Sequence, residues 1–382
     1  MPPLPGPRPI RRLLSQVDLL RDLGPRQGLH YWHSRSSVAY ETVMVLSHRL
    51  YRRIWEEAAA EVKADVRQVG AGFLEISRGS RTTFVWLQEV MLDHPVTARL
   101  ALDKPLVRCL LQAADLPVPD ALKCSARDTR AAADFVEAGG TPCVVKPANG
   151  SGGIGVTCSV ATVSDLRRAT LRAAAFDDTL LIERQAAGED YRLLLLDGRL
   201  LGVVRRGKPQ VIGDGISSIA ELIEAENRRR LSGPADGSTF FLRPDLDCMF
   251  TLRGQNLKLR TVPTLGERIV VKTAVNQNSA RDQDTVTAVA PELVEEAARA
   301  AAAVGLRLAG VDIVTSDPGS SLAAAGGVVL EVNANPGLHY HYLVADLASA
   351  VPVAIPILAT LLAERNRMAH PSKRRQALES AL

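Results

Sequence analysis

Two short apolar segments near the C-terminal end of the chain carry a set of oxygen-bearing side chains. Gly310–Val314 and Val328–Gly337 are rich in Val and Ile and are separated by a Ser-, Gly- and Ala-rich connection, a pattern that predicts two paired strands. Successive side chains of a strand point to opposite faces, so Glu331 and Asn333 share one face, and Asp312 can meet them from the paired strand. Two carboxylates and an amide oxygen suit Mg²⁺, whose remaining ligands are usually nucleotide phosphates. The alternative is two ordinary strands that end in polar residues.

The composition argues against two classes of partner. Lys and Arg exceed Asp and Glu by only four, and no dense basic run is interleaved with aromatic residues, so we expect no nucleic-acid binding. No apolar stretch approaches the roughly 20 residues that a membrane-spanning helix needs, so we expect no membrane partner. The five cysteines show neither zinc-site spacing nor a disulfide framework. Free thiols are typical of a reducing compartment, and we expect a cytoplasmic protein.

The first part of the chain divides into a loose start and a long helix. Residues 1 to about 35 contain several Pro and Arg residues and little periodicity. Leu46, Leu50 and Ile54 recur at four-residue spacing, which predicts an amphipathic helix over about 36–64. Residues 68 to 90 then read as short strands.

The remainder mixes hairpins with helices. An Asp-Gly pair predicts a tight hairpin within 193–204, and Pro291 and Gly305 are typical of the two ends of a helix over 291–304. Other predicted elements are helices at 104–114 and 217–230, strands at 143–147 and 180–183, and an irregular stretch at 231–265. The mixture predicts an α+β fold rather than a doubly wound parallel sheet.

A glycine-rich segment directly follows a short strand that carries a lysine. Lys146 lies in the apolar run that Pro147 ends, and Asn149–Gly155 contains four glycines. Glycines let backbone N–H groups approach phosphate oxygens closely, and a lysine beside them supplies a point charge. A mobile surface loop is the more common explanation of such a segment taken alone. The lysine before it and the oxygen ligands downstream favour a nucleotide-binding loop.

The ordered set of motifs resembles the ATP-grasp superfamily, and within it the ATP-grasp portion of the cyanophycin synthetases. The resemblance covers roughly two-thirds of the chain and is carried by eight segments: Ala101–Lys104, Val144–Pro147, Asn149–Gly155, Leu181–Arg184, Gly188–Leu193, Val211–Gly215, Ile219–Leu222 and Glu331–Gly337. It implies an ATP-grasp fold of two α+β subdomains that clasp ATP, over 98–182 and 183–350. The flanking parts would be an N-terminal α/β region, 1–97, and a C-terminal helix and tail, 351–382.

The resemblance also implies roles for individual residues. Lys104 and Lys146 would contact the ATP phosphates, Glu183 and Arg184 would lie at the hinge beside the adenine, and Asp190 would bind the ribose. The loop that closes over the triphosphate would consist of Gly150, Ser151, Gly152, Gly153, Ile154 and Gly155. Two Mg²⁺ ions, or Mn²⁺ in their place, would be held by Asp312, Glu331 and Asn333, with Glu331 bridging.

The acceptor region departs from the pattern of the resemblance. Lys272, Asn278 and Arg281 lie where relatives often place groups near the developing oxyanion, and they are the candidate catalytic residues. His339 and His341 follow the Asn-Pro-Gly turn. We interpret them as surface histidines, with a place in the substrate site as the alternative.

The resemblance implies an ATP-dependent carboxylate–amine ligase. Such an enzyme activates a carboxylate as an acyl phosphate, which an amine attacks to give an amide, ADP and phosphate. The chain has no Gly-Lys-Ser or Gly-Lys-Thr motif for a second ATP site, so we expect one amide bond, between small carboxylate and amine substrates such as amino acids or small peptides. The alternatives are an ATP-grasp kinase acting on a small molecule and a non-catalytic ATP-binding scaffold. The N-terminal helix is a candidate homodimer surface.

Overall fold

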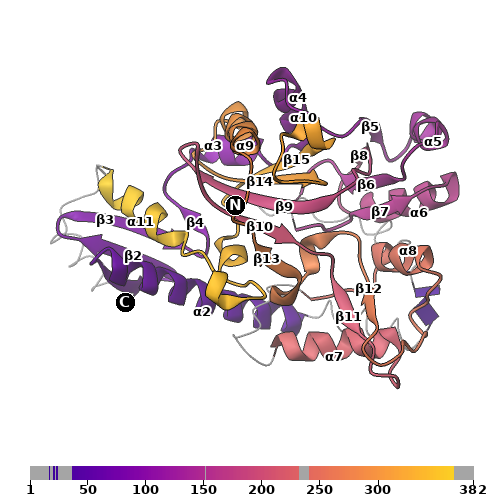
Figure 1. Ribbon diagram of the computed structural model, residues 1–382, viewed down its shortest axis with the longest axis horizontal. Coiled ribbons are helices and arrows are strands. Elements are labelled where there is room, and N and C mark those ends of the chain that lie inside the picture. Colours follow the sequence, from indigo (N-terminus) through magenta and orange to yellow (C-terminus); the bar gives the residue numbers. More distant parts are fainter. Residues whose placement is uncertain are drawn as a thin grey trace.

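The computed structural model describes residues 17, 20, 21, 23, 24, 37–150, 152–231 and 241–364. Figure 1 shows three bodies that follow one another along the chain, with the C-terminal helix returning to the first of them. Within these residues no helix is both long enough and apolar enough to traverse a bilayer.

The N-terminal body is a long helix packed on a small antiparallel sheet. Helix α2 runs over Ser37–Glu61, close to the predicted 36–64. The sheet has the order β1-β2-β3-β4, and its strands are Asp65–Val69, Phe73–Arg78, Arg81–Trp86 and Glu89–Val90. The C-terminal helix α11, Ala354–Ala363, packs against α2 and β3. Helices α2 and α11, far apart in the sequence, therefore share one body.

The second body carries the predicted lysine strand. Helices α3 (Pro95–Leu100) and α4 (Lys104–Ala113) lead into a sheet of order β5-β8-β6-β7. Asp103 caps α4 by accepting a hydrogen bond from the Leu106 N–H, which fixes the start of the helix at Lys104. In chain order, β5 to β8 are Ala121–Ser125, Cys143–Pro147, Thr157–Val160 and Thr179–Arg184. The helices of this body, α5 and α6, are Arg130–Glu137 and Val163–Ala173.

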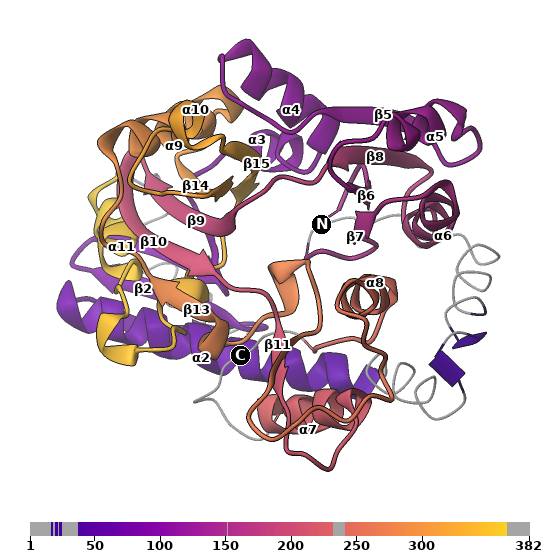
Figure 2. The ribbon, with the colours of Figure 1, turned by 45° about the vertical axis from the view of Figure 1, so that its right-hand side comes forward.

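The third body is a five-stranded antiparallel sheet of order β13-β10-β9-β14-β15. Its strands, in chain order, are Glu189–Leu196, Arg199–Arg206, Gln283–Thr285, Leu308–Thr315 and Val328–Ala334. Helix α9, Pro291–Val304, starts at its proline and ends at Gly305, which has φ 81°, in agreement with the prediction. Helix α10, Leu322–Ala325, lies in the connection before the last strand. Two 3₁₀ helices follow that strand: η4, Leu338–His341, and η5, Leu347–Ser349. Figure 2 shows this sheet and the β5–β8 sheet on two sides of the molecule.

A smaller unit is inserted between β10 and β13. It pairs β11, Gln210–Ile212, with β12, Arg268–Val270, and carries helices α7, Ile219–Leu231, and α8, Leu246–Gly254. The prediction of irregular structure over 231–265 is wrong for α8. The side chain of Asp245 caps the N-terminus of this helix. Short 3₁₀ helices η2 and η3, Val275–Gln277 and Ala280–Asp282, lead back to the large sheet.

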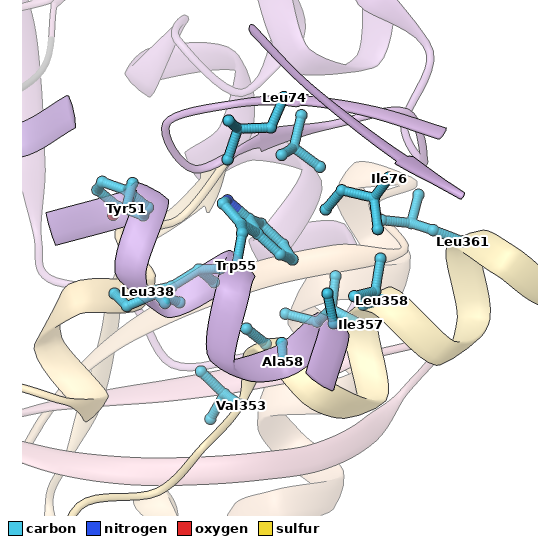
Figure 3. Packing of buried hydrophobic residues seen from close by; sticks show 14 of the residues in the cluster. Tyr51, Trp55, Ala58, Leu74, Ile76, Leu338, Val353, Ile357, Leu358 and Leu361 are labelled. Atoms are coloured by element: carbon cyan, nitrogen blue, oxygen red, sulfur yellow. The ribbon is translucent and has the colours of Figure 1, made fainter. Parts of the chain in front are cut away.

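The largest cores lie on the two faces of the five-stranded sheet. One contains Leu193, Leu195 and Val311 beneath α4 and α9. The other contains Leu194, Leu196 and Leu308, and it continues into the N-terminal body. The alternation of Leu193–Leu196 between the two faces is the reason for this arrangement. Figure 3 shows the second core, with Trp55, Leu338 and Ile357 packed together from three distant segments. The antiparallel sheets and helices confirm the α+β prediction.

Candidate active site

The predicted oxygen ligands lie on neighbouring strands, and two of them, Asp312 and Glu331, line a cleft. Asp312 on β14 pairs with Glu331 on β15, and the register then shifts so that Ile313 pairs with Val329. A bulge of this kind re-aims the side chains beside it. Asn333 donates a hydrogen bond from Nδ2 to Oδ2 of Asp312, at 3.1 Å. The three side chains therefore form one cluster, as the alternation along the strands predicts.

Two arginines neutralise Asp312. Arg192 on β9 binds both carboxylate oxygens, with 2.7 Å between Nη2 and Oδ2, and Arg206 on β10 places Nη1 3.5 Å from Oδ2. Burial disfavours the charged carboxylate, but the two guanidinium groups outweigh it and lower the pKa of Asp312. The carboxylate is therefore ionised at neutral pH.

Lys104 connects the glycine loop with the ligand cluster. Its Nζ lies 2.7 Å from Oε1 of Glu331 and donates to the carbonyl oxygen of Gly150 at 2.8 Å. Burial opposes the charge on Glu331, and Lys104 and Lys146 together more than offset it, so the pKa of Glu331 is lowered. A cation already stands beside each of the two carboxylates.

The lysine of β6 forms a second buried ion pair. Lys146 lies 2.6 Å from Oε2 of Glu183 on the neighbouring strand β8, and both side chains are buried. Burial disfavours the ammonium charge, but Glu183 and then Glu331 reverse the effect and raise the pKa of Lys146. A charged lysine at this point suits an anionic ligand.

The glycine loop lines one side of the cleft. Gly150, Gly152, Gly153 and Gly155 all have positive φ, which other residues adopt with strain. A Cβ on Gly153 would overlap the side chain of Asn276, and one on Gly155 would crowd Phe176 and Pro147. The loop therefore has to be glycine where it meets the 273–276 segment. Ile154 is exposed, and Ser151 lies outside the described residues.

One further carboxylate lines the cleft. Asp190 lies near the start of β9, and it is paired in register with Arg206 on the neighbouring strand β10. Burial raises the pKa of Asp190 to about 6, against the attraction of Arg206. Among the residues that line the same cleft are Val144, Arg184, Gln185, Lys208, Thr273 and Leu330. The cleft thus contains apolar walls and a dense set of charges.

Sequence comparisons identify the family. Residues 110–211 match the family model described as the D-ala D-ala ligase C-terminus. The cyanophycin synthetase of Trichormus variabilis is 31% identical over 279 residues, which are 72% of this chain and 31% of that protein. The chain belongs to the ATP-grasp superfamily. The resemblance predicted from the motifs is confirmed.

Other comparisons agree with this membership. The glutathione biosynthesis bifunctional protein GshAB of Listeria monocytogenes is 27% identical over 84% of this chain and 42% of its own length. The crystal structure of a bifunctional glutathione synthetase from Pasteurella multocida superposes with a TM-score of 0.50 and 19% identity, over 78% of this chain and 41% of that one. The likeness of fold confirms the ATP-grasp architecture. The chain spans about a third of the length of the cyanophycin synthetases it matches.

The donor set of this ATP-grasp chain fits a hard divalent cation. Family membership implies ATP with Mg²⁺ or Mn²⁺, and both ions favour oxygen ligands. Asp312 and Glu331 are ionised, and Asn333 lies beside Asp312 with an amide oxygen as a third potential ligand. Among the described residues no three His, Cys, Asp or Glu side chains gather as a metal cluster.

The three candidate catalytic residues lie outside the set of described residues that lines the cleft, and two of them have other partners. Lys272 is buried and binds both carboxylate oxygens of Asp245, each at 2.7 Å. Asn278 donates to the carbonyl oxygen of Gly207 at 3.0 Å, and Arg281 is exposed on η3. None of the three belongs to the described residues that line the cleft. Their catalytic role stays a prediction.

Arg192 and Arg206 are site residues that sequence reasoning missed. A signal for Arg192 was present, because it follows Asp190 by two positions on a strand and so points to the same face. Arg206 is 3% exposed and donates from Nη2 to Oδ1 of Asn276 at 3.0 Å. Only the antiparallel pairing of β9 with β10 brings it opposite Asp190.

The interpretation of His339 and His341 as surface histidines is wrong. Both are buried, because η4 turns back under the five-stranded sheet after the Asn-Pro-Gly segment. Burial and then the nearby Arg192 lower the pKa of each imidazole to about 3. Both rings are neutral at physiological pH. Neither belongs to the residues that line the cleft.

Proposed function

We propose that the chain is an ATP-dependent carboxylate–amine ligase that makes one amide bond through an acyl phosphate and releases ADP and phosphate. The observation that carries the proposal is the meeting of Lys104, Lys146, Asp312 and Glu331 in one cleft beside the glycine loop. Phosphoryl transfer requires positioning and charge neutralisation of this kind more than covalent chemistry. The names of the relatives, which are synthetases and a D-ala D-ala ligase, support amino acids or small peptides as substrates.

ATP would enter between the two sheets and exchange partners with the ion pairs already there. Lys104 and Lys146 would turn from Glu331 and Glu183 toward phosphate oxygens, which offer more negative charge. Glu183 and Arg184 would then face the adenine, and Asp190 the ribose hydroxyls. The glycine loop, Gly150–Gly155, would close over the triphosphate and exclude water, which would otherwise hydrolyse an acyl phosphate.

Asp312, Glu331 and Asn333 would hold two divalent cations, with Glu331 shared between them. Mg²⁺ suits the oxygen ligands, and Mn²⁺ fits the same set. When bound, these ions neutralise the phosphate charge that the lysines leave uncompensated. Arg192 and Arg206 would hold Asp312 ionised and ready to bind.

Arg206 is a further candidate for binding the reacting carboxylate, beside Lys272, Asn278 and Arg281. Its Nε is buried and has no hydrogen-bond partner among the described residues, although the side chain lines the cleft. A planar guanidinium matches a carboxylate or a developing oxyanion in geometry as well as charge. Asn276 would orient it through the hydrogen bond from Nη2.

The test is a pairwise screen of amino acids and small peptides for phosphate release that depends on the amine, with mass analysis of the product. With an ¹⁸O-labelled carboxylate, one label should appear in inorganic phosphate, because the oxygen that attacks the γ-phosphorus leaves with it. AMP and pyrophosphate would indicate adenylation instead. Release of ADP without an amine, together with a stable phosphorylated product, would favour the kinase alternative.

A further inference from the structure

The N-terminal helix makes a direct hydrogen bond to the wall of the ligand cluster. Tyr51 of α2 is 3% exposed, and its hydroxyl lies 2.8 Å from Nδ1 of His339, 288 positions later in the chain. The backbone N–H of His339 donates to the same hydroxyl at 3.5 Å. Figure 3 shows Tyr51 beside Leu338, at the start of η4. Two polar groups of η4 therefore meet one hydroxyl of the N-terminal body.

The protonation states suit a hydrogen bond between two neutral side chains. Burial, assisted by Arg192 and Arg206, lowers the pKa of His339 to about 3, so its ring is neutral. Burial also raises the pKa of Tyr51, so the hydroxyl keeps its proton. A neutral imidazole carries a proton on one nitrogen only, so Nδ1 and the Tyr51 hydroxyl share one hydrogen bond in either tautomer of the ring.

From His339 the contact continues to the arginines of the site. The ring of Tyr340 lies 4.1 Å from that of His339, centroid to centroid. The guanidinium carbon of Arg206 is 4.7 Å from the centroid of Tyr340, and that of Arg192 is 5.3 Å from it. Both distances are within the range of cation–π attraction. One aromatic ring thus faces both of the cations that neutralise Asp312.

We propose that Tyr51 is a positioning residue of the active site: through His339 it fixes η4, so that Tyr340 holds Arg192 and Arg206 in place beside Asp312. The inference rests on the proposed role of Asp312 as a metal ligand. It assigns a function to the N-terminal helix that goes beyond packing.

The physical reason lies in the two competing partners of the arginines. Each guanidinium is attracted to the carboxylate of Asp312 on one side and to the face of Tyr340 on the other. If Tyr340 moves, the ring no longer restrains Arg206, whose Nη1 is 3.5 Å from Oδ2, and this cation is free to settle on Asp312 as closely as Arg192 already does. A divalent cation then has to displace two closely bound arginines to reach the carboxylate. Loosening η4 should therefore weaken metal binding more than nucleotide binding.

The test compares Tyr51→Phe with Tyr342→Phe. Each substitution removes one hydroxyl from a tyrosine of the same core region, and that of Tyr342 accepts from the N–H of Ala354 at 3.1 Å, away from the arginines. Mn²⁺ binding is titrated by electron paramagnetic resonance, in the presence of a non-hydrolysable ATP analogue. We expect Tyr51→Phe to weaken Mn²⁺ binding about fivefold, the effect of one lost hydrogen bond. Affinity for the ATP analogue should change less than twofold, and Tyr342→Phe should leave both unchanged.

A double-variant cycle separates positioning from general destabilisation. Tyr340→Leu removes the ring beneath the arginines and should weaken Mn²⁺ binding by at least as much as Tyr51→Phe. In the Tyr340→Leu background, Tyr51→Phe should have no further effect, because its influence passes through the missing ring. All four proteins are titrated at one temperature below the lowest of their melting points, and additive losses would overturn the inference.

The outcomes also distinguish this inference from the proposed function. Wild-type protein that binds no Mn²⁺ with the nucleotide analogue would overturn the metal site and the inference together. Normal wild-type binding that Tyr51→Phe leaves unchanged, or that both phenylalanine variants weaken equally, would overturn the inference alone.

Discussion

At the scale of single residues, the site consists of charges that are already paired. Glu331 is held by Lys104, Glu183 by Lys146, and Asp312 by Arg192. Paired groups keep their ionised forms despite burial, because the partner more than offsets the loss of water. We therefore expect ATP and the cations to exchange partners with these ion pairs when they bind.

Glu331→Gln keeps the shape of the side chain and removes one charge. We expect turnover to fall roughly 10²-fold or more, the scale on which single electrostatic groups act, with little change in thermal stability. The control is Glu364→Gln, which removes the same charge from the exposed ion pair with Arg307, and which should leave turnover unchanged. Steady-state rates of both variants at saturating ATP check the prediction. Full activity of Glu331→Gln would remove this residue from the metal site.

Lys104→Met should act in opposite directions on the two ligands. Without the ammonium group, Glu331 loses the cation 2.7 Å away, so Mn²⁺ binding in the absence of nucleotide should strengthen. ATP binding should weaken about tenfold, because a phosphate contact is lost. Calorimetric titrations of each ligand measure the two effects separately. A loss of affinity for both ligands would contradict partner exchange at Glu331.

The buried histidines predict a dependence of stability on pH. His339 and His341 have pKa values of about 3 in the folded protein, so they bind protons mainly after unfolding, where the pKa is about 6.5. Stability from this source is complete above pH 6.5 and is lost as the pH falls from there toward 3, by up to about 1.4 kcal/mol per pH unit for each ring. Urea unfolding between pH 7.5 and 5 measures the slope. His341→Gln should remove the contribution of one ring, and an unchanged slope would show that His341 titrates normally.

At the scale of elements, the glycine loop packs directly against the 273–276 segment. Gly153 has φ 66°, and its position leaves no room for a Cβ beside Asn276, whose Oδ1 accepts from Arg206. The loop is therefore coupled to an arginine of the ligand cluster.

Gly153→Ala should displace Asn276 and with it Arg206, and should lower turnover about 10-fold to 10²-fold, as small misplacements of reacting groups do. Gly79 is the matched control, since its φ is 62° and nothing lies within 4 Å of a Cβ there. Gly79→Ala should lose about 1 kcal/mol of stability from backbone strain and no activity. Melting temperatures and rates of both variants separate strain from the loss of the contact. Equal activities would mean that the loop and Asn276 work independently.

At the scale of the whole molecule, the N-terminal body and the large sheet share one core. Trp55, Ile76 and Ile357 pack in the same cluster as Leu194 and Leu308 of the five-stranded sheet. We therefore expect the part before residue 97 and the part after it to unfold together. The division into 1–97, 98–350 and 351–382 stays a prediction, as does the homodimer.

Trp55→Ala should lower the free energy of unfolding by about 3–5 kcal/mol, because the side chain is fully buried and leaves a cavity. All three tryptophans, Trp32, Trp55 and Trp86, lie within the first 97 residues, so intrinsic fluorescence reports on that part alone. Release of a fluorescent ATP analogue reports on the cleft. The two transitions should coincide in wild type and move together in the variant. Separate transitions would show that the N-terminal body unfolds by itself.

The sequence predicts the parts of the site that depend on residues close together along the chain. The pairing of Asp312 with Glu331 follows from alternation in two strands, and the strand at Lys146 follows from an apolar run that a proline ends. The α+β class follows from the mixture of hairpins and helices, and the ATP-grasp fold from the family resemblance that the ordered motifs carry. Both are confirmed.

Only the tertiary structure decided which charges face each other. Lys272 reads in the sequence as a candidate near the oxyanion, yet the fold places it against Asp245, 27 positions away. Arg206 enters the site because β10 pairs with β9, and His339 becomes buried because Tyr51 of a distant helix covers it. The energy of a buried charge depends on its nearest partners in space, and packing brings those partners together from anywhere along the chain.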